Sequence, residues 1–242
     1  MRTLSVAHLG PTGYREGLAI QEGLVRACAE DRTGDWLLFP DHPPVLTVGR
    51  SGAAGSLRSD PETLRRLGIE IFEVARGGDF TWHGPGQLVG YLVCDLNARG
   101  RDLHRFLRDL EAGLIWALGE WGLAGATVPG RTGVWVGGEK IASLGVAVRR
   151  WVSYHGFALN VAPDLKFFDL IHPCGLRGIH MTSLAARLGS GAPGLAGARE
   201  AVAGHLARQL GYAGWIRSAP EEARRLSVSA DVGTIEHAGA AR

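Results

Sequence analysis

Cysteine is scarce in this sequence of 242 residues, which contains only Cys28, Cys94 and Cys174. The three lie far apart and none belongs to a C-x-x-C pair, so the sequence predicts neither a disulfide framework nor a structural zinc site. Free thiols are typical of a reducing compartment, and we expect a cytoplasmic protein that holds no metal.

Long apolar runs are also absent. No run reaches the roughly 18 residues of a membrane-spanning helix, and residues 1–8 lack the apolar stretch of a secretory signal. The formal net charge is only +2, which does not indicate a nucleic-acid-binding protein. Hydrophobic residues make up 45% and charged residues 21%, as is typical of a packed globular protein. We therefore expect neither a membrane protein nor a nucleic-acid partner.

Lysine is the rarer basic residue: of 26 lysines and arginines, only Lys140 and Lys166 are lysine. Each is of interest because lysine can lose its proton, whereas arginine keeps it. Lys140 opens the apolar segment 141–148, where a buried ammonium is costly unless it is paired. The alternative is an exposed lysine at the mouth of a hairpin.

The apolar pattern alternates between strand-like and helix-like segments. It predicts a mixed α/β or α+β sheet rather than regular βαβ winding. We expect one domain over residues 1–226, with a frayed Ala/Gly-rich tail over 227–242. The predicted strands are 4–9, 36–39, 45–48, 69–75, 88–96, 134–136, 141–148 and 154–161, and the predicted helices are 14–30, 61–68, 103–121 and 198–210.

Residues 76–87 form a glycine-rich segment, predicted as a loop between two strands. Its four glycines would allow close approach of the backbone to a ligand, with N–H groups directed at it. Arg76, Thr81, His83 and Gln87 add polar side chains. The segment is not a phosphate-binding loop of the G-x-x-x-x-G-K-[ST] type. Polar and aromatic residues in so short a segment favour a binding site over a plain turn.

Cys174 differs from the other two cysteines in its surroundings. It lies in a Pro-Cys-Gly turn, whereas Cys28 and Cys94 fall inside a predicted helix and strand, as small buried apolar residues do. The turn predicts a functional thiol at Cys174. Thr182 and Ser183 follow, and they could form a helix cap or line the same pocket; a helix cap is the expected role.

Taken together and in this order, seven blocks of the sequence resemble the octanoyltransferase family of protein lipoylation. The most specific is Arg-Gly-Gly-x-x-Thr-aromatic-His-x-x-Gly-Gln-x-x-x-Tyr, which residues 76–91 reproduce without a gap. The resemblance extends over about residues 4–212, but residues 176–181 do not align with the family pattern and receive no role. The other blocks are residues 42–49, 131–135, 140–142, 155–160, 173–175 and 182–184.

The resemblance implies the catalytic fold shared by lipoate- and biotin-protein ligases. It implies transfer of an octanoyl group from octanoyl-acyl carrier protein to a lysine of a lipoyl domain, in 2-oxoacid dehydrogenases and glycine cleavage H proteins. By the same resemblance, Cys174 is the nucleophile that carries the acyl group and Lys140 lowers its pKa, while His83 either transfers a proton or shapes the pocket. The implied substrate-binding residues are Arg76, Gly77, Gly78, Asp79, Phe80, Thr81, Trp82, His83, Ser143, Leu144, Gly145, Gly156, Phe157 and Ala158.

The residues are compatible with this chemistry on independent grounds. A thioester donor is already activated, so transfer to an amine needs no nucleotide, and no cofactor is expected. Cysteine is the most nucleophilic side chain at neutral pH, and a nearby ammonium lowers the thiol pKa from about 8.5. No heptad pattern is present, and we expect a monomer.

Three other functions are compatible with parts of the pattern. A lipoate-protein ligase would activate a free acid with ATP and would need a nucleotide loop. A thioester hydrolase would pair Cys174 with His83 or His155. A non-catalytic carrier-protein-binding module would have no need of both Cys174 and Lys140.

Overall fold

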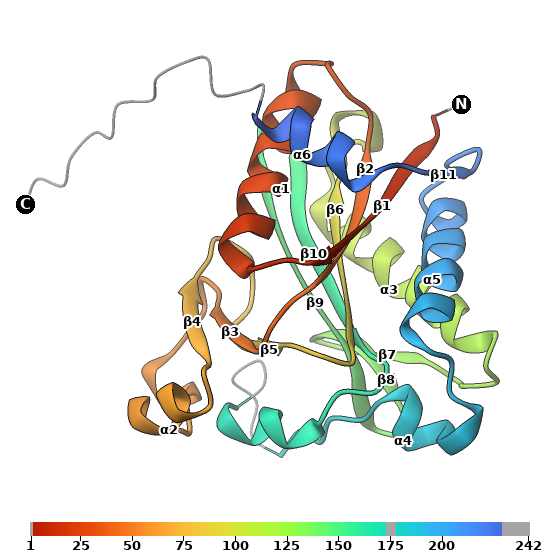
Figure 1. Ribbon diagram of the computed structural model, residues 1–242. Coiled ribbons are helices and arrows are strands. Elements are labelled where there is room, and N and C mark those ends of the chain that lie inside the picture. Colours follow the sequence, from red (N-terminus) through yellow and green to blue (C-terminus); the bar gives the residue numbers. More distant parts are fainter. Residues whose placement is uncertain (1, 173–177, 229–242) are drawn as a thin grey trace, which may run out of the picture.

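A computed structural model describes residues 2–172 and 178–228 (Figure 1). Its largest element is an eight-stranded mixed sheet with the order β11-β1-β2-β6-β10-β9-β8-β7. Strand β1 pairs in parallel with both β2 and β11, and the remaining pairs are antiparallel. The strands are β1 (Leu4–Pro11), β2 (Trp36–Asp41), β6 (Gln87–Val93), β7 (Ala126–Val128), β8 (Arg131–Val136), β9 (Glu139–Arg149), β10 (Val152–Asn160) and β11 (Trp215–Arg217).

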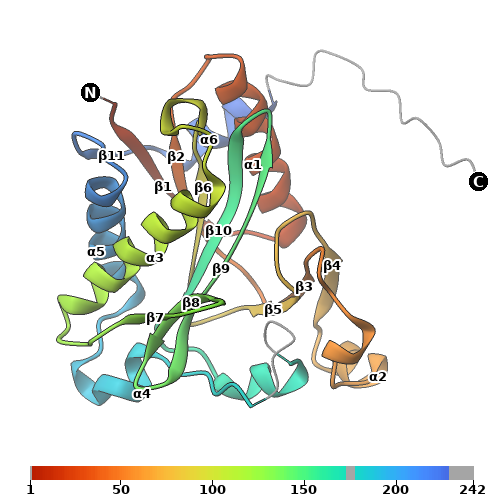
Figure 2. The ribbon, with the colours of Figure 1, turned by 180° about the vertical axis from the view of Figure 1, so that it is seen from behind.

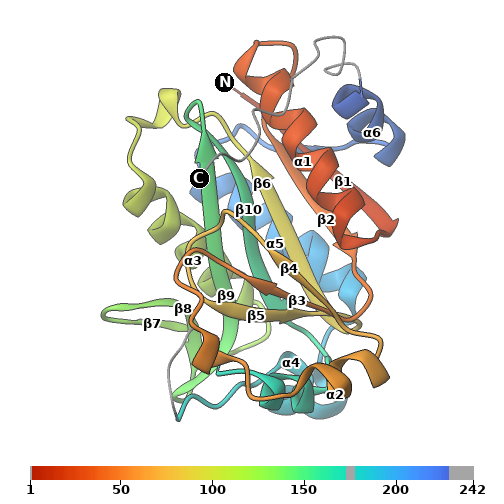
Figure 3. The ribbon, with the colours of Figure 1, turned by 90° about the vertical axis from the view of Figure 1, so that its left-hand side faces the viewer.

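A second, three-stranded sheet crosses one face of the large sheet (Figure 3). Its central strand β3 (Val45–Val48) pairs in parallel with β4 (Glu70–Glu73) and antiparallel with β5 (Phe80–His83). The Gly77 N–H donates to the Val146 carbonyl of β9 at 3.0 Å, which joins the two sheets. Strand β5 lies inside the glycine-rich segment, so the prediction of a continuous loop there is wrong.

Helices cover both faces of the large sheet (Figures 1 and 2). Helices α1 (Tyr14–Ala29) and α6 (Pro220–Val228) lie on one face, and α3 (Leu103–Gly119) and α5 (Leu195–Gln209) on the other. Strand β2 shows why both faces are needed: Leu37 and Phe39 pack toward α3 and α5, whereas Trp36 and Leu38 pack toward α1. Successive side chains of a strand point to opposite faces, so a strand apolar on both requires two layers of helix.

The predicted starts of two helices, at residues 61 and 103, are confirmed by their caps, whereas the helix predicted from 198 begins at Leu195. The Asp60 carboxylate accepts from the Thr63 N–H at 2.9 Å and caps the start of α2 (Pro61–Arg66). The Asp102 carboxylate likewise accepts from the Arg105 N–H and caps the start of α3. Ser183 caps α4 (Leu184–Leu188), as expected. Short 3-10 helices lie at Ala54–Ser56, Asn97–Arg99, Leu165–Leu170 and Gly189–Gly191.

The C-terminal part of the described chain differs from the expected tail. Ser227 and Val228, which the prediction placed in the tail, are the last residues of α6. Ser227 packs so closely on Gly23 of α1 that a Cβ at Gly23 would overlap it. The division of the chain into one domain and a tail stays a prediction. Within residues 2–172 and 178–228, no helix is long and apolar enough to cross a bilayer.

Candidate active site

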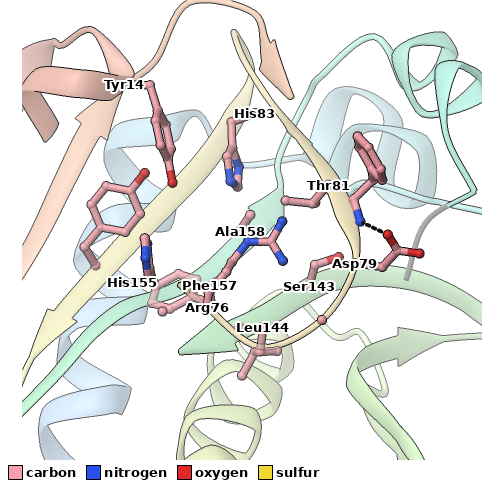
Figure 4. A pocket seen from close by; sticks show the side chains of 15 residues that line it. Tyr14, Arg76, Asp79, Thr81, His83, Ser143, Leu144, His155, Phe157 and Ala158 are labelled. Carbon is pink, nitrogen blue, oxygen red and sulfur yellow. Dashed lines mark hydrogen bonds between the residues drawn. The ribbon is translucent and has the colours of Figure 1, made fainter. Parts of the chain in front are cut away.

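A pocket lies between the small sheet and strands β9 and β10 (Figure 4). Its volume is about 480 Å³, including the mouth that opens to solvent. All of the predicted substrate-binding residues except Gly77 and Trp82 line it. The lining consists of Tyr14, Arg76, Gly78, Asp79, Phe80, Thr81, His83, Tyr91, Ser143, Leu144, Gly145, His155, Gly156, Phe157 and Ala158.

Trp82 lies outside the lining because of the alternation of β5. Thr81 and His83 line the pocket, so the side chain between them points to the opposite face of the strand. There the Trp82 ring is fully buried and stacks on Phe167 at a centroid distance of 5.0 Å. Gly77 is bonded to β9 through its backbone. These two residues support the pocket wall from behind.

Arg76 is a buried part of the pocket wall. Its guanidinium donates to the Thr47 carbonyl at 2.8 Å, to the Thr47 hydroxyl at 2.7 Å and to the Gly77 carbonyl at 3.0 Å. A Cβ at Gly49 would lie 2.8 Å from Arg76 Nη1, so only glycine leaves room for the guanidinium. The hydrogen bonds fix the start of the glycine-rich segment to β3.

Asp79 fixes the other side of the same turn. Its carboxylate accepts from the backbone N–H groups of Phe80 at 2.8 Å and Ala53 at 3.3 Å, and from the Ser56 hydroxyl. The Ser56 carbonyl in turn accepts from the His172 N–H at 2.7 Å. A hydrogen-bonded chain therefore runs from the pocket to His172, which immediately precedes residues 173–177.

Lys140 lies inside the molecule, with 1% of its surface exposed, so the alternative of an exposed hairpin lysine is wrong. Its Nζ donates to the Thr132 carbonyl at 2.9 Å and lies 5.6 Å from the centre of the Trp135 ring. Gly133, with φ of +142°, makes room for it: a Cβ there would lie 3.0 Å from Nζ. Lys166, by contrast, is exposed.

A buried carboxylate completes the surroundings of Lys140. Glu111 of α3 accepts the Gly133 N–H at 2.8 Å and pairs with Arg108 at 2.7 Å. Burial raises the pKa of Glu111, while the Gly133 N–H and the charges of Arg108 and Lys140 lower it. Glu111 thus holds the turn that makes room for the lysine.

Cys174 lies outside the described residues, so its distance to Lys140 stays a prediction. The described residues on either side of that segment are both anchored. His172 is bonded to Ser56, and the His180 carbonyl accepts from the Lys140 N–H at 2.9 Å. His172, just before this segment, is therefore joined through Ser56 to Asp79, and His180, after the segment, is hydrogen-bonded to Lys140.

The other two cysteines are buried beside Asp35. Cys28 Sγ lies 3.9 Å and Cys94 Sγ 3.6 Å from carboxylate oxygens of Asp35. Burial and this carboxylate raise the pKa of each thiol to about 12. Such thiols stay protonated at neutral pH, which confirms their expected structural role.

The pocket has a second end that the sequence identified only in part. Tyr14, Tyr91 and His155 line it, together with the predicted His83. Tyr91 and His155 are part of the family blocks, whereas nothing in the local sequence marks Tyr14. Strands and helices that are distant in the sequence bring them together, because α1, β6 and β10 are neighbours in the fold.

The imidazole of His83 is neutral and fixed in one tautomer. Gln87 Nε2 donates to the Asn160 side chain at 3.0 Å, so Gln87 Oε1 must accept, and it receives the His83 Nδ1–H at 2.8 Å. Burial and the neighbouring His42 lower the pKa of His83 to about 3. At neutral pH His83 therefore presents an accepting Nε2, and it has no proton to spare for a leaving group.

Proteins of similar sequence identify the family of this chain. The family model of the lipoyl protein ligase A/B catalytic domain matches residues 13–207. The chain is 49% identical over 201 residues to an octanoyltransferase of Geobacter metallireducens, covering 83% of this chain and 91% of the relative. The chain belongs to the octanoyltransferase family. It is also 52% identical over 183 residues to the octanoyltransferase of Citrifermentans bemidjiense, covering 75% of this chain and 85% of that one.

Solved structures share the fold of this octanoyltransferase-family chain. A lipoate-protein ligase A bound with ATP superposes with a TM-score of 0.76 at 18% identity, covering 95% of this chain and 94% of that one. Ta0514, a putative lipoate protein ligase from T. acidophilum, gives 0.74 at 17% identity, with 95% and 93% covered. The expected mixed α/β architecture of lipoate-protein ligases is confirmed. At 17–18% identity, the similarity to these structures establishes the fold of this chain and nothing about its activity.

Proposed function

We propose that this protein transfers an octanoyl group from octanoyl-acyl carrier protein to a lysine of a lipoyl domain, by way of a thioester on Cys174. The acceptors proposed are the lipoyl domains of 2-oxoacid dehydrogenases and the glycine cleavage H proteins. The observation that carries the proposal is the buried Lys140 in a chain about 50% identical to octanoyltransferases. A buried ammonium is costly, so its place in this family is best explained by chemistry.

The proposed reaction proceeds in two acyl transfers. The Cys174 thiolate attacks the donor carbonyl, a C–S bond forms, and the carrier thiolate leaves. The lysine amine of the lipoyl domain then attacks the new thioester, the C–N bond forms and the C–S bond to Cys174 breaks, so that the Cys174 thiolate leaves. The proton lost by the attacking amine passes to the Lys140 amine, which thereby returns to the ammonium form. The Lys140 ammonium favours the thiolate, and as an ammonium it can protonate the departing carrier thiolate.

The pocket walls suit the acyl chain. Leu144, Phe157 and Ala158 supply apolar surface, and Thr81 and Ser143 lie at the half-buried mouth. Sites for small molecules commonly combine an apolar cavity with a few polar groups. We assign the predicted lining residues to the binding of the donor's acyl group.

The rival functions are less well supported. His83 and His155 both have a pKa lowered to about 3 by burial, so neither is a good base for a hydrolase. A ligase would require a nucleotide, and the thioester donor makes that activation unnecessary.

The deciding experiment mixes the protein with octanoyl-acyl carrier protein without ATP and follows the intact mass. We expect an octanoyl adduct on Cys174 that disappears when a lipoyl domain is added. Dependence on ATP would point to a ligase, release of free octanoate to a hydrolase, and binding without an adduct to a carrier-protein module.

A further inference from the structure

The two ends of the pocket differ in exposure. At one end Thr81, Ser143 and Leu144 are half-buried and form the mouth. At the other end Tyr14 and His155 are only 4% and 3% exposed. Figure 4 places Tyr14 and His155 opposite Asp79, Thr81 and Ser143. The pocket is therefore a blind channel rather than a groove open at both ends.

The pairing of β9 with β10 gives the length of this channel. Ser143 lies opposite Ala158 and Val146 opposite His155, which are three residue steps apart. Three steps of a strand cover about 10 Å. An extended backbone covers about 1.2 Å per bond, so the seven C–C bonds of an octanoyl chain span about 8 Å. Two further carbons would reach the rings at the closed end.

These rings are held by hydrogen bonds and by one another, and we name them the ring cluster: Tyr14, His42, His83, Tyr91 and His155. The Tyr91 hydroxyl donates to His42 Nε2 at 2.6 Å, and His42 Nδ1 donates to the Thr12 carbonyl at 2.7 Å. The Tyr14 ring stacks on His83, with an interplanar angle of 7°.

The cost of disturbing the ring cluster exceeds what a longer chain gains. One more buried methylene improves affinity about fourfold, or about 0.8 kcal/mol. Leaving one buried hydrogen-bonding group without its partner lowers affinity about tenfold to a hundredfold. A chain that must separate Tyr91 from His42 is therefore bound less tightly than one that stops short of them.

His155 makes the closed end polar as well as rigid. Its backbone has φ of +57°, uncommon for a residue other than glycine, and its N–H donates to Gln21 Oε1 at 2.7 Å. Its Nε2 is buried and has no hydrogen-bond partner among the described residues. A hydrocarbon end gains little by covering such an atom.

We propose that the ring cluster is the stop that limits the length of the acyl chain, and that Tyr14 is the residue that closes the channel. The proposal rests on the octanoyl transfer proposed above. Tyr14 is singled out by what lies behind it: its ring contacts Phe72 at 5.0 Å, and Phe72 is half-buried near the surface. Removal of the Tyr14 ring would extend the channel toward the surface without breaking the bond between Tyr91 and His42.

The test measures binding of free hexanoate, octanoate and dodecanoate by calorimetry, independently of transfer. In the wild type we expect octanoate to bind about 15-fold more tightly than hexanoate and dodecanoate at least about tenfold more weakly than octanoate. Tyr14→Ala and Tyr14→Leu should each raise the dodecanoate-to-octanoate affinity ratio at least about tenfold. Tyr14→Phe keeps the ring and should keep the wild-type limit.

The matched control is Tyr154→Ala, which removes a tyrosine that packs on His155 but does not line the pocket. The proposed stop would be overturned by an unchanged affinity ratio in folded Tyr14→Ala and Tyr14→Leu, or by an equal change of that ratio in Tyr154→Ala. It would also be overturned if the wild type bound none of the acids, or if its affinity rose steadily up to dodecanoate. If the ratio changes as expected while no Cys174 adduct forms, the stop stands and the proposed transfer is wrong.

Discussion

The two ends of the pocket differ in charge as well as in exposure. Toward the mouth lies a bonded carboxylate, Asp79. The fixed guanidinium of Arg76 lies between the two ends (Figure 4), and its charge acts on Tyr14 and His155. At the closed end burial keeps Tyr14 protonated, with a pKa raised to about 12, and His155 neutral, with a pKa lowered to about 3. The charged groups of the lining thus lie at the mouth and in the middle of the pocket, and the groups at the closed end are neutral. Substitutions near the mouth should change rates, and those at the closed end should change selectivity and pH response.

The largest effect expected is at the nucleophile. Cys174→Ser should lower octanoyl transfer by about 10³-fold or more, because a serine hydroxyl is far harder to ionise. Cys28→Ser and Cys94→Ser are the matched controls and should keep most of the activity, since neither thiol lies in the pocket. Transfer assays on the three variants decide this. Near wild-type turnover in Cys174→Ser would show that the nucleophile is another group.

The next effect concerns the ammonium. Lys140→Met should raise the thiol pKa, and alkylation of Cys174 at neutral pH should slow about tenfold for every pH unit by which that pKa rises. Lys140→Arg keeps the charge but not the compact ammonium, and it should retain part of the thiolate yet lose much of the turnover. The measurement is the rate of iodoacetamide reaction at Cys174 against pH. Superimposable curves for wild type and Lys140→Met would contradict the pairing of these residues.

Gly133 offers a milder way to displace the same lysine. Gly133→Ala should lower transfer about tenfold, because its Cβ would overlap Lys140 and its φ of +142° disfavours a side chain. Gly130→Ala is the control: it also has a positive φ, of +75°, but no atom lies within 4 Å of its Cβ. Gly130→Ala should lose about 1–2 kcal/mol of stability and Gly133→Ala more, and only Gly133→Ala should lose activity in the folded protein. Equal transfer rates per folded molecule in the two variants would mean that the position of Lys140 does not matter.

The smallest effect concerns the response of stability to pH. His155 has a folded-state pKa of about 3, below its ordinary 6.5, so the unfolded chain binds a proton that the folded chain excludes. Its contribution is intact above pH 6.5 and is lost at up to about 1.4 kcal/mol per pH unit as the pH falls toward 3. His155→Asn should reduce the slope of urea-unfolding stability between pH 6.5 and 5, with the contribution of His83 remaining, whereas His104→Asn, at an exposed position, should not reduce it. Parallel slopes for wild type and His155→Asn would refute the neutral imidazole.

Most of the pocket could be predicted from the sequence, but Tyr14 at the closed end could not. Residues 76–83 and 143–145 come as short contiguous blocks, so the resemblance to the family implies most of the lining at once. Tyr14 belongs to a helix and was indistinguishable from any other apolar residue of that helix. It becomes a pocket residue only because α1 packs beside β10 and because Phe72 of the small sheet lies behind it.

The same contrast applies to the fold. The caps Asp60 and Asp102 act on residues three positions away, so their signals can be read locally. Strands β5 and β11 have four and three residues, and their pairing partners, β3 and β1, lie elsewhere in the chain. Glycine-rich flanks made β5 look like a loop, and its strand conformation comes from the pairing with β3. The inward and outward faces of β5, and with them the burial of Trp82, follow from that pairing.

The parallel pairing of β1 with β11 has a consequence for how the chain is made. Leu4, Ser5 and Val6 pair with Trp215, Ile216 and Arg217, so one side of an early strand stays without its neighbour until almost the whole described chain has been synthesised. Loop closure over such a separation adds little to the thermodynamic cost, since that cost grows only with the logarithm of loop length. The delay is kinetic: on the ribosome, the backbone groups on this side of β1 are the ones a chaperone would meet longest.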